Sequence, residues 1–307
     1  MIHVHSLDEI ELADSWLTIG IFDGVHRGHQ GIIRRLTDGA RSTAVPAVVV
    51  TFWPHPATVL AGVRVRSLTI PDERADLLVP LGVDVVVTHT FDAVLADTSA
   101  LDFVQRLQQR LGFQHLLIGY DFALGKGREG NATRLRDIGR QLGYSLEVIP
   151  ALSDESGVVS STEIRKLVAT GDVGEAAKLL GRSYALHGPV VHGDGRGRDL
   201  GFPTANIDYP AEKILPSNGV YACWAWIDGR RYQSAVNVGT RPQFHSEASA
   251  PLVEAYLLDF DRVIYGADLR LEFVSRLRDE LKFVSVQALV EEIGRDVART
   301  RDLLSIN

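Results

Sequence analysis

Apolar residues in the first half of the chain fall into short runs that alternate with longer amphipathic segments. The short runs are rich in Val, Ile and Leu, as buried parallel strands are, and they cover residues 16–22, 44–52, 83–91, 113–122 and 144–152. The segments between them have apolar residues at helical spacing, over residues 29–42, 72–82, 100–112 and 132–143. This alternation predicts an α/β domain, with a doubly wound parallel sheet covered by helices on both faces.

The pattern changes after residues 160–182, where short apolar runs follow one another with turn residues between them. These runs cover residues 184–193, 219–229, 230–239, 251–260 and 270–277. The Asp228–Gly229 pair between two of them is a β-hairpin signal. This rhythm predicts a small antiparallel β-barrel, and an amphipathic helix over residues 285–304 closes the chain. We therefore expect two domains, residues 1–182 and 183–307.

Composition and charge narrow the classes of function. The chain has 307 residues and a net charge of −7, so it offers no general basic field for nucleic acid. Its single cysteine, Cys223, excludes an internal disulfide and a multi-cysteine metal site. It shows no leader pattern, and its apolar runs fall short of the roughly 20 residues of a membrane helix. We expect a soluble, cytoplasmic protein without nucleic-acid or membrane partners, and self-association stays open.

The stretch GIFDGVHRGH, residues 20–29, places two histidines directly after the first predicted strand. The strand is expected to end at Phe22 and the next helix to start near His26. His26 and His29 then lie at the carboxyl end of a parallel strand and at a helix N-terminus, where sheets of this kind bind ligands and phosphates. Gly28 leaves room for close approach of a ligand. The residue types alone leave three interpretations open: metal ligands, packing or capping residues, and contacts to transferring phosphates.

Two further segments are candidates for the same ligand site. In VVSSTEIR, residues 158–165, Ser160, Ser161 and Thr162 can cap a helix, and Arg165 can bind phosphate oxygens with its planar fork. The same residues also form a helix start that needs no ligand. The glycine-rich stretch GYDFALGKGREGN, residues 119–131, is either a cover over a ligand or an ordinary surface loop.

The motifs and their order resemble those of a known family. GIFDGVHRGH, TFWPHP, GYDF and SSTEIR resemble the adenylyltransferase domain of the bacterial bifunctional riboflavin kinase/FAD synthetase family. GDGRGRDLGFPTANI, GVYA, NVGTRPQF and VEAYLLDF resemble its riboflavin kinase domain, and GRDLGFPTAN is highly specific. The resemblance covers nearly the whole chain. It implies that the C-terminal domain phosphorylates riboflavin with ATP to give FMN, and that the N-terminal domain transfers AMP from ATP to FMN to give FAD and pyrophosphate. It implies Mg²⁺ in both reactions.

For the first domain, the resemblance implies that His26 and His29 stabilise the α-phosphate of ATP while the FMN phosphate attacks it. It also implies that Ser161, Thr162 and Arg165 hold the triphosphate tail. The turn after the first strand is expected to supply further ATP contacts, at Gly20, Phe22, Asp23, Gly24 and Gly28. The same resemblance assigns Asp121 of the GYDF loop to the flavin or nucleotide site.

For the second domain, Thr204 and Asn206 lie two apart on an extended segment and share one face. Their neutral oxygens suit Mg²⁺, and the resemblance assigns the Mg²⁺–nucleotide to this pair. It implies that Glu254 is the base for the ribityl 5′-hydroxyl and that Arg278 lies beside the flavin. Residue type alone would make Glu254 a solvated strand carboxylate and Arg278 a helix-surface charge. A glycine-rich flap over ATP is expected at Gly195, Gly197 and Gly201.

The chain departs from the family pattern at several positions, among them Trp53, Gln243 and Tyr256. None of these changes removes a proposed catalytic group, so we expect both activities, riboflavin kinase and FMN adenylyltransferase. One alternative is that a single activity is retained, with FAD synthesis as the survivor. Another is a flavin-binding protein without catalysis, and Glu254 argues against it because binding alone needs no base.

Overall fold

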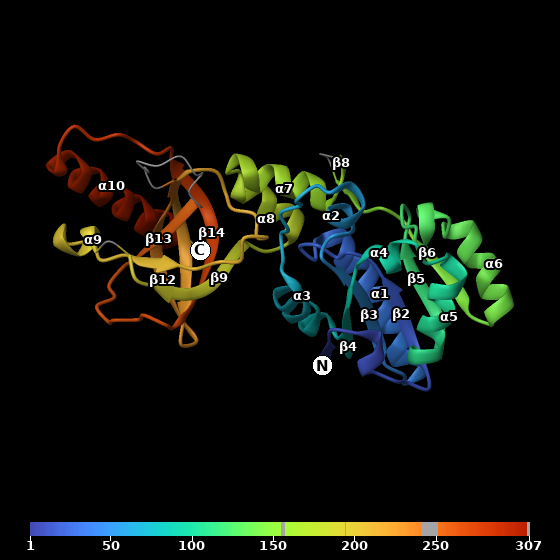
Figure 1. Ribbon diagram of the computed structural model, residues 1–307. Coiled ribbons are helices and arrows are strands. Elements are labelled where there is room, and N and C mark those ends of the chain that lie inside the picture. Colours follow the sequence, from blue (N-terminus) through green and yellow to red (C-terminus); the bar gives the residue numbers. More distant parts are fainter. Residues whose placement is uncertain (155–156, 194, 241–250, 306–307) are drawn as a thin grey trace. The chain divides into compact units, whose positions relative to one another are not determined.

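The chain forms two compact units, Met1–Ser161 and Thr162–Asn307, in a computed structural model that describes residues 1–154, 157–193, 195–240 and 251–305 (Figure 1). Two helices, α7 (Ser161–Thr170) and α8 (Val173–Leu180), precede the strands of the second unit. The boundary predicted after residue 182 corresponds to the start of those strands, and the division into compact units lies nearer the start of α7.

A six-stranded parallel sheet with the order β1-β4-β3-β2-β5-β6 forms the centre of the first unit. Its strands are β1 (Ile2–Val4), β2 (Ser15–Ile19), β3 (Ala47–Trp53), β4 (Val85–Thr90), β5 (Phe113–Gly119) and β6 (Ser145–Ile149). The parallel α/β fold is thus confirmed, but the predicted count of five strands was wrong. The missed strand, β1, has three residues and a histidine at its centre, so its sequence carries no apolar run.

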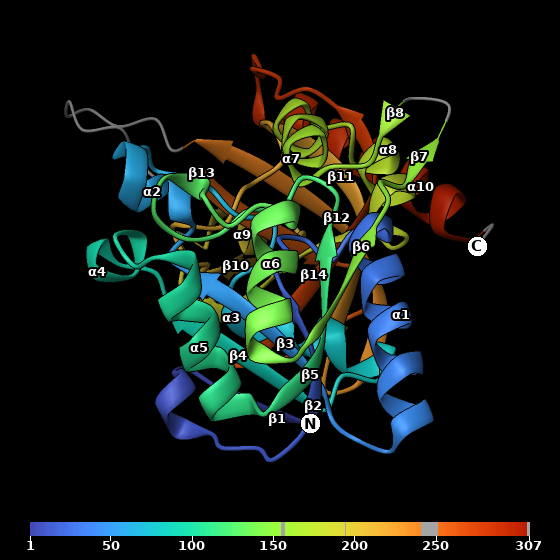
Figure 2. The ribbon, with the colours of Figure 1, turned by 90° about the vertical axis from the view of Figure 1, so that its right-hand side faces the viewer.

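Helices cover both faces of this sheet (Figure 2). They are α1 (Arg27–Thr43), α3 (Pro71–Leu78), α5 (Ala100–Leu111) and α6 (Ala132–Leu142). Val49 of β3 packs in the core under α1 and α3, while Val48 and Val50 pack in the core under α5 and α6. Alternate residues of one strand therefore enter opposite cores, which is why the strands read as continuous apolar runs.

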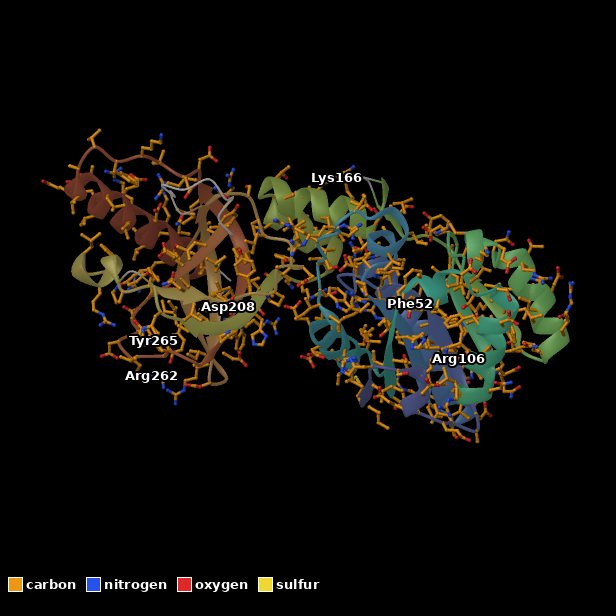
Figure 3. The ribbon with its side chains drawn as sticks, viewed as in Figure 1. Phe52, Arg106, Lys166, Asp208, Arg262 and Tyr265 are labelled. Atoms are coloured by element: carbon orange, nitrogen blue, oxygen red, sulfur yellow. The ribbon has the colours of Figure 1, made fainter. Side chains whose placement is uncertain are left out.

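Shorter elements connect these layers. They are η1 (Leu7–Glu9), α2 (Pro56–Ala61), η2 (Val79–Leu81), α4 (Ala93–Ala96), η3 (Lys126–Arg128), β7 (Ser153–Asp154) and β8 (Gly157–Val158). Figure 3 shows Phe52 inside the first unit and Arg106 on α5, where the guanidinium of Arg106 lies 3.0 Å from the carboxylate of Asp8.

The second unit contains a closed barrel in which all neighbouring strands are antiparallel, with the order β10-β13-β12-β11-β14-β9. Its strands are β9 (Tyr184–Val191), β10 (Ala205–Ile207), β11 (Gly219–Ile227), β12 (Arg230–Thr240), β13 (Pro251–Leu257) and β14 (Asp268–Arg278). Asp228 and Gly229 have φ values of 50° and 71°, as the predicted hairpin turn requires. The barrel is confirmed, and β10 is a strand that the apolar pattern did not reveal.

The closing helix α10 (Val286–Ser305) packs against β11, β12 and β14 of the barrel. Its buried face is largely polar, because Glu292, Asp296 and Thr300 are all at most 8% exposed. None of the helices in the described part of the chain has the length and hydropathy of a membrane span.

Candidate functional site

The histidine turn lies where the order of strands in the sheet reverses. From β2 the chain moves outward through β3 and β4 on one side, and then through β5 and β6 on the other. The turn at residues 20–26 leaves the carboxyl end of β2, and the loop at residues 120–131 leaves the carboxyl end of the adjacent β5. Ligands of open α/β sheets bind in the crevice between two such loops. Asp121 begins the second loop, and its backbone carbonyl accepts a hydrogen bond from Arg128 at 3.0 Å.

The backbone of the turn adopts a conformation that most residues avoid. Phe22, Gly24 and Val25 have φ values of 48°, 79° and 41°. A positive φ is unfavourable for a branched residue such as Val25 and persists only where surrounding contacts impose it. Such backbone strain clusters at ligand sites, so the turn is a site candidate on its geometry as well as its sequence.

Contacts to Asp23 hold this turn in place. The buried Asp23 Oδ1 accepts hydrogen bonds from the backbone N–H groups of Leu68 and Thr69, at 2.9 and 3.0 Å. Thr69 Oγ1 accepts one from the Gly24 N–H at 2.9 Å. The Ser161 hydroxyl donates to the Asp23 carbonyl at 2.9 Å. The helix start that the sequence singled out is therefore joined to the histidine turn through Ser161.

A fully buried arginine on α3 belongs to the same network. Arg74 donates to Thr51 Oγ1 at 2.7 Å and to the Thr69 carbonyl at 3.1 Å, and it is 1% exposed. Thr69 Oγ1 lies between Arg74 and Asp23, at 3.5 Å from Arg74 Nε and 3.4 Å from Asp23 Oδ1. Hydrogen bonds of this kind offset part of the cost of burying the guanidinium charge. The network therefore holds the charged groups of Asp23 and Arg74 in place beneath the histidine turn.

The two histidine rings stack on each other, with centroids 3.6 Å apart and an interplanar angle of 21°. His26 is the N-cap of α1, and its Nδ1 accepts the backbone N–H of His29 at 3.4 Å. Accepting through Nδ1 places the proton of a neutral His26 on Nε2, which is the nitrogen that can donate to a phosphate. A Cβ on Gly28 would lie 3.1 Å from the His26 ring, so this glycine permits the stack.

His29 lies between the His26 ring and the edge of Phe22, whose ring centroid is 5.2 Å away. Within the described residues its buried Nδ1 has no hydrogen-bond partner. Burial, followed by the charges of His26 and Arg74, lowers the pKa of His29 well below its usual value. His29 is therefore neutral at neutral pH, and an approaching phosphate would favour its charged form.

The interpretation of this pair as metal ligands finds no support. In the described ranges, the His, Cys, Asp and Glu group with a geometry suited to a metal ion lies elsewhere, at His3, His5 and Asp72. The other two interpretations are compatible, because a neutral histidine that caps a helix through Nδ1 carries its ring proton on Nε2. Thr162 and Arg165 belong to the second unit, where Arg165 donates to the Thr162 hydroxyl at 3.2 Å.

In the second unit, strand register aligns the predicted kinase residues in one row. Asn206 of β10 pairs with Glu254 of β13, and Glu254 pairs with Asn237 of β12. Asn237 pairs with Val220 of β11, which pairs with Arg278 of β14. Residues directly opposite one another share a face of the sheet. We call Asn206, Glu254 and Asn237 the polar row.

The amide of Asn206 fits a role as a cation ligand. Its side chain is 5% exposed, and Oδ1 has no hydrogen-bond partner among the described residues. A Cβ on Gly193 would lie 2.1 Å from Nδ2, so the preceding loop presses against the amide. Phe202 packs edge-on against Tyr256 at 5.3 Å and anchors the segment that leads to Thr204. An orphaned, buried oxygen of this kind suits a hard cation such as Mg²⁺.

Arg278 is engaged by helix α10. Its Nε and Nη2 donate to the Asp296 carboxylate at 3.1 and 2.7 Å, and Glu292 lies 3.6 Å away. The interpretation of Arg278 as a helix-surface charge is wrong, because it ends strand β14 and its side chain is 14% exposed. A flavin that contacts Arg278 would bind a guanidinium that already donates hydrogen bonds to Asp296.

The remaining predicted positions have varied surroundings. In the flap segment, Gly195 and Gly201 have φ values of 74° and 82°, and α9 (Arg196–Asp199) lies between them. A Cβ on Gly197 would lie 2.4 Å from the Phe202 carbonyl. Trp53 ends β3 half-buried, and Gln243 lies outside the described residues.

Sequence reasoning missed three residues of these sites: Thr69, Arg74 and Asn237. Arg74 lies in an amphipathic segment where an arginine is ordinarily at the surface. Asn237 is a single polar residue between Val236 and Val238 of β12, and nothing in the local sequence names its partner. Their positions come from contacts across 45 or more residues in the case of Thr69 and from strand register in the case of Asn237.

Comparisons with known proteins identify the family. Residues 8–163 match the family model described as FAD synthetase, and residues 180–304 match the one described as riboflavin kinase. The chain belongs to the bifunctional riboflavin kinase/FMN adenylyltransferase family. It is 34% identical to the member from Listeria monocytogenes, across 97% of this chain and 95% of that protein. It is 35% identical to the member from Bacillus subtilis, across 96% of this chain and 94% of that protein.

A solved structure also matches both units of this family member. It is described as a macrolide-efflux protein from Streptococcus pneumoniae, and it is 30% identical with a TM-score of 0.88. The match covers 98% of each chain. A FAD synthetase domain and a riboflavin kinase domain are therefore both present, in the order that the sequence motifs predicted.

Proposed function

We propose that this protein makes FAD from riboflavin in two ATP-dependent steps, one in each unit. The observation that carries the proposal is the presence of two separate polar constellations in one chain: the strained histidine turn of the first unit and the polar row of the second. The family of the chain and the names of its relatives support both activities. The predicted domains, residues 1–182 and 183–307, are part of the proposal.

In the first unit, the proposed reaction is attack of an FMN phosphate oxygen on the α-phosphorus of ATP. The bond between the α- and β-phosphates breaks, and pyrophosphate leaves. His26 donates through Nε2 to the α-phosphate as its charge is redistributed, and His29 supports the stack beside it. The rest of the turn, at Gly20, Phe22, Asp23, Gly24 and Gly28, holds the backbone for the nucleotide. Ser161, Thr162 and Arg165 are proposed for the triphosphate tail and Asp121 for the flavin or nucleotide side.

In the second unit, the proposed reaction is attack of the ribityl 5′-hydroxyl of riboflavin on the γ-phosphorus of ATP. The bond between the β- and γ-phosphates breaks, and ADP leaves. Glu254 takes the proton of this hydroxyl, and Asn237 beside it orients the carboxylate. Thr204 and Asn206 would hold Mg²⁺, whose charge would offset that of the ATP phosphates. Gly195, Gly197 and Gly201 form the segment that covers ATP, and Arg278 lies on the flavin side.

A product assay tests the proposal. The purified chain is incubated with riboflavin, ATP and Mg²⁺, and the flavins are separated by chromatography. We expect both FMN and FAD, and a lack of both would refute the proposal. Supplying FMN in place of riboflavin tests the alternative that one activity is retained, because FAD from FMN without FMN from riboflavin means an inactive kinase.

Two variants test the division of labour. His26→Ala combined with His29→Ala should lower FAD formation by about 10² to 10³ or more and leave FMN formation unchanged. Glu254→Gln should lower FMN formation by about 10² to 10⁴ and leave the conversion of supplied FMN to FAD unchanged. A cytoplasmic location and the lack of nucleic-acid and membrane partners stay predictions from composition.

A further inference from the structure

A cluster of metal-ligating side chains lies at the edge of the sheet in the first unit, apart from the histidine turn. It consists of His3 on β1, His5 directly after β1, and Asp72 in the first turn of α3. One possible ligand atom from each lies within 4.8 Å of those of the other two. Strand β1 is three positions from β2 in the sheet, roughly 14 Å at ordinary strand spacing. The two histidines therefore lie away from the turn that follows β2.

His3 of β1 and His5, just past its end, have neighbouring rings. Their rings are 4.7 Å apart between centroids, with an angle of 51° between the ring planes. Asp72 approaches from α3, with Oδ1 3.5 Å from His3 Nδ1. The N-terminal strand is thus faced by α3 as well as paired with β4 (Figure 1).

A contact behind His3 orients its ring. Nε2 lies 2.9 Å from the hydroxyl of Thr88 on β4, a residue that is 4% exposed. If Nε2 donates to this hydroxyl, Nδ1 carries the lone pair and points toward the Asp72 carboxylate. Two acceptors then face each other, an arrangement that a cation between them stabilises. Metal-binding histidines ordinarily have their second ring nitrogen hydrogen-bonded in this way.

The charges around the cluster favour a cation as well. Asp76 lies one turn after Asp72 on α3, and Glu9 belongs to η1. The carboxylate of Glu9 also lies 3.4 Å from the backbone nitrogen of His5. Two imidazoles and a carboxylate form the ligand set of borderline divalent ions such as Zn²⁺ and Co²⁺, whereas Mg²⁺ and Ca²⁺ prefer oxygen ligands.

We propose that His3, His5 and Asp72 form a binding site for a divalent transition-metal ion of the Zn²⁺ class. The three protein ligands leave a fourth position for water or for a neighbouring carboxylate. Bound metal connects β1 to α3 and thereby stabilises the first unit. The site is independent of the proposed flavin chemistry.

The experiment uses the full chain without a histidine tag, stripped of metal with a chelator. Co²⁺ is titrated and its visible d–d absorption is recorded, and Zn²⁺ is then used to displace it. We expect saturation at one equivalent and displacement by Zn²⁺. At a hundredfold excess of Zn²⁺ over Kd, the melting temperature should rise by roughly 5 °C. A lack of saturable binding would overturn the proposal.

Matched variants locate the ion. His5→Asn and Asp72→Asn change exposed side chains, and each should weaken Co²⁺ binding by about tenfold or more and remove the Zn²⁺-dependent rise in melting temperature. His187→Asn is the control, because it changes another exposed histidine that faces an aspartate, Asp268 at 3.6 Å. Binding that is unchanged in His5→Asn and Asp72→Asn, or that is lost in the control, would place the ion elsewhere and overturn the proposal.

Discussion

His29 shows how strongly packing can change the chemistry of a single residue. An exposed histidine titrates near pH 6.5, but burial beside His26 and Arg74 lowers the pKa of His29 well below that value. The neighbouring Gly28 matters because it lacks a side chain. A Cβ at this position would lie 3.1 Å from the His26 ring. The lowered pKa of His29 and the close space between Gly28 and the His26 ring each lead to a prediction.

The low pKa of His29 predicts a pH-dependent stability. The unfolded chain binds a proton at this residue below about pH 6.5, whereas the folded chain binds it only at lower pH. The free energy of unfolding should therefore fall as the pH drops from about 6.5 toward the folded pKa. His29→Asn should flatten this slope. Urea unfolding at a series of pH values measures it, and an identical slope in the variant would contradict the assignment.

Gly28→Ala should displace the stacked histidines. The added Cβ would be too close to the His26 ring, so we expect FAD formation from FMN to fall by about tenfold or more while FMN formation is unchanged. Gly31→Ala is the matched control on the same helix, since a Cβ there meets no atom within 4 Å. The control should keep its activity and gain up to about 1 kcal/mol in stability. Equal activities in the two variants would contradict this role for Gly28.

At the scale of elements, both candidate sites depend on contacts between segments that are distant in the chain. In the first unit, the loop before α3 supplies the donors that hold Asp23, and α3 supplies Arg74. In the second unit, the pairing of three strands brings Asn206, Glu254 and Asn237 into the polar row. Local sequence predicts each helix and strand, but it carries no signal for these partners.

Thr69→Val tests the support of the histidine turn. The substitution keeps the shape of the side chain and removes the hydroxyl that lies between Asp23, Gly24 and Arg74. We expect a loss of about 1–3 kcal/mol in the free energy of unfolding, together with slower FAD formation from FMN. Thr98→Val, which removes a hydroxyl bound to the Val94 carbonyl in α4, is the control. Unchanged stability and FAD synthesis in Thr69→Val would refute the role.

Asn237→Ala tests the polar row. Its side chain faces Glu254 across β12 and β13, so its loss should lower kcat for FMN formation by about tenfold while KM for ATP changes little. If Asn237 had only a structural role, its loss would lower the free energy of unfolding without lowering kcat selectively relative to KM for ATP. Gln233→Ala on the same strand, opposite Leu258 through a backbone contact, is the control. Full riboflavin kinase activity in Asn237→Ala would show that Asn237 has no role in the site.

At the scale of the whole molecule, the two units have different folds and separate cores. Most residues proposed for each reaction belong to the sheet or the barrel of one unit. Damage to one site should therefore leave the other intact. This expectation concerns the chain as a whole and needs an experiment with both activities present.

Mixing two inactive variants tests this independence. Neither Glu254→Gln nor the His26→Ala, His29→Ala double variant should convert riboflavin to FAD efficiently by itself. Together they should do so, because FMN released by the second is a substrate for the first. FAD formation in the mixture should rise steeply with protein concentration. Chromatography of the flavins over time measures it, and a mixture no better than its parts would show that the two sites cannot work in separate chains.

The sequence by itself determined the type and order of most elements, the two-part organisation and the positions of the motif residues. Apolar periodicity and turn residues act over a few neighbouring positions, so such features can be read locally. It also placed His26, His29, Thr204, Asn206 and Glu254 in candidate sites through the motifs that contain them.

Only the tertiary structure decided how these residues are supported. The short strand β1, the buried Arg74, the alignment of Asn237 with Glu254 and the engagement of Arg278 by Asp296 depend on segments separated by 17 to more than 80 residues. The cluster at His3, His5 and Asp72 has the same origin. Burial and long-range pairing follow from the packing of the whole unit, and this is why no local pattern reveals them.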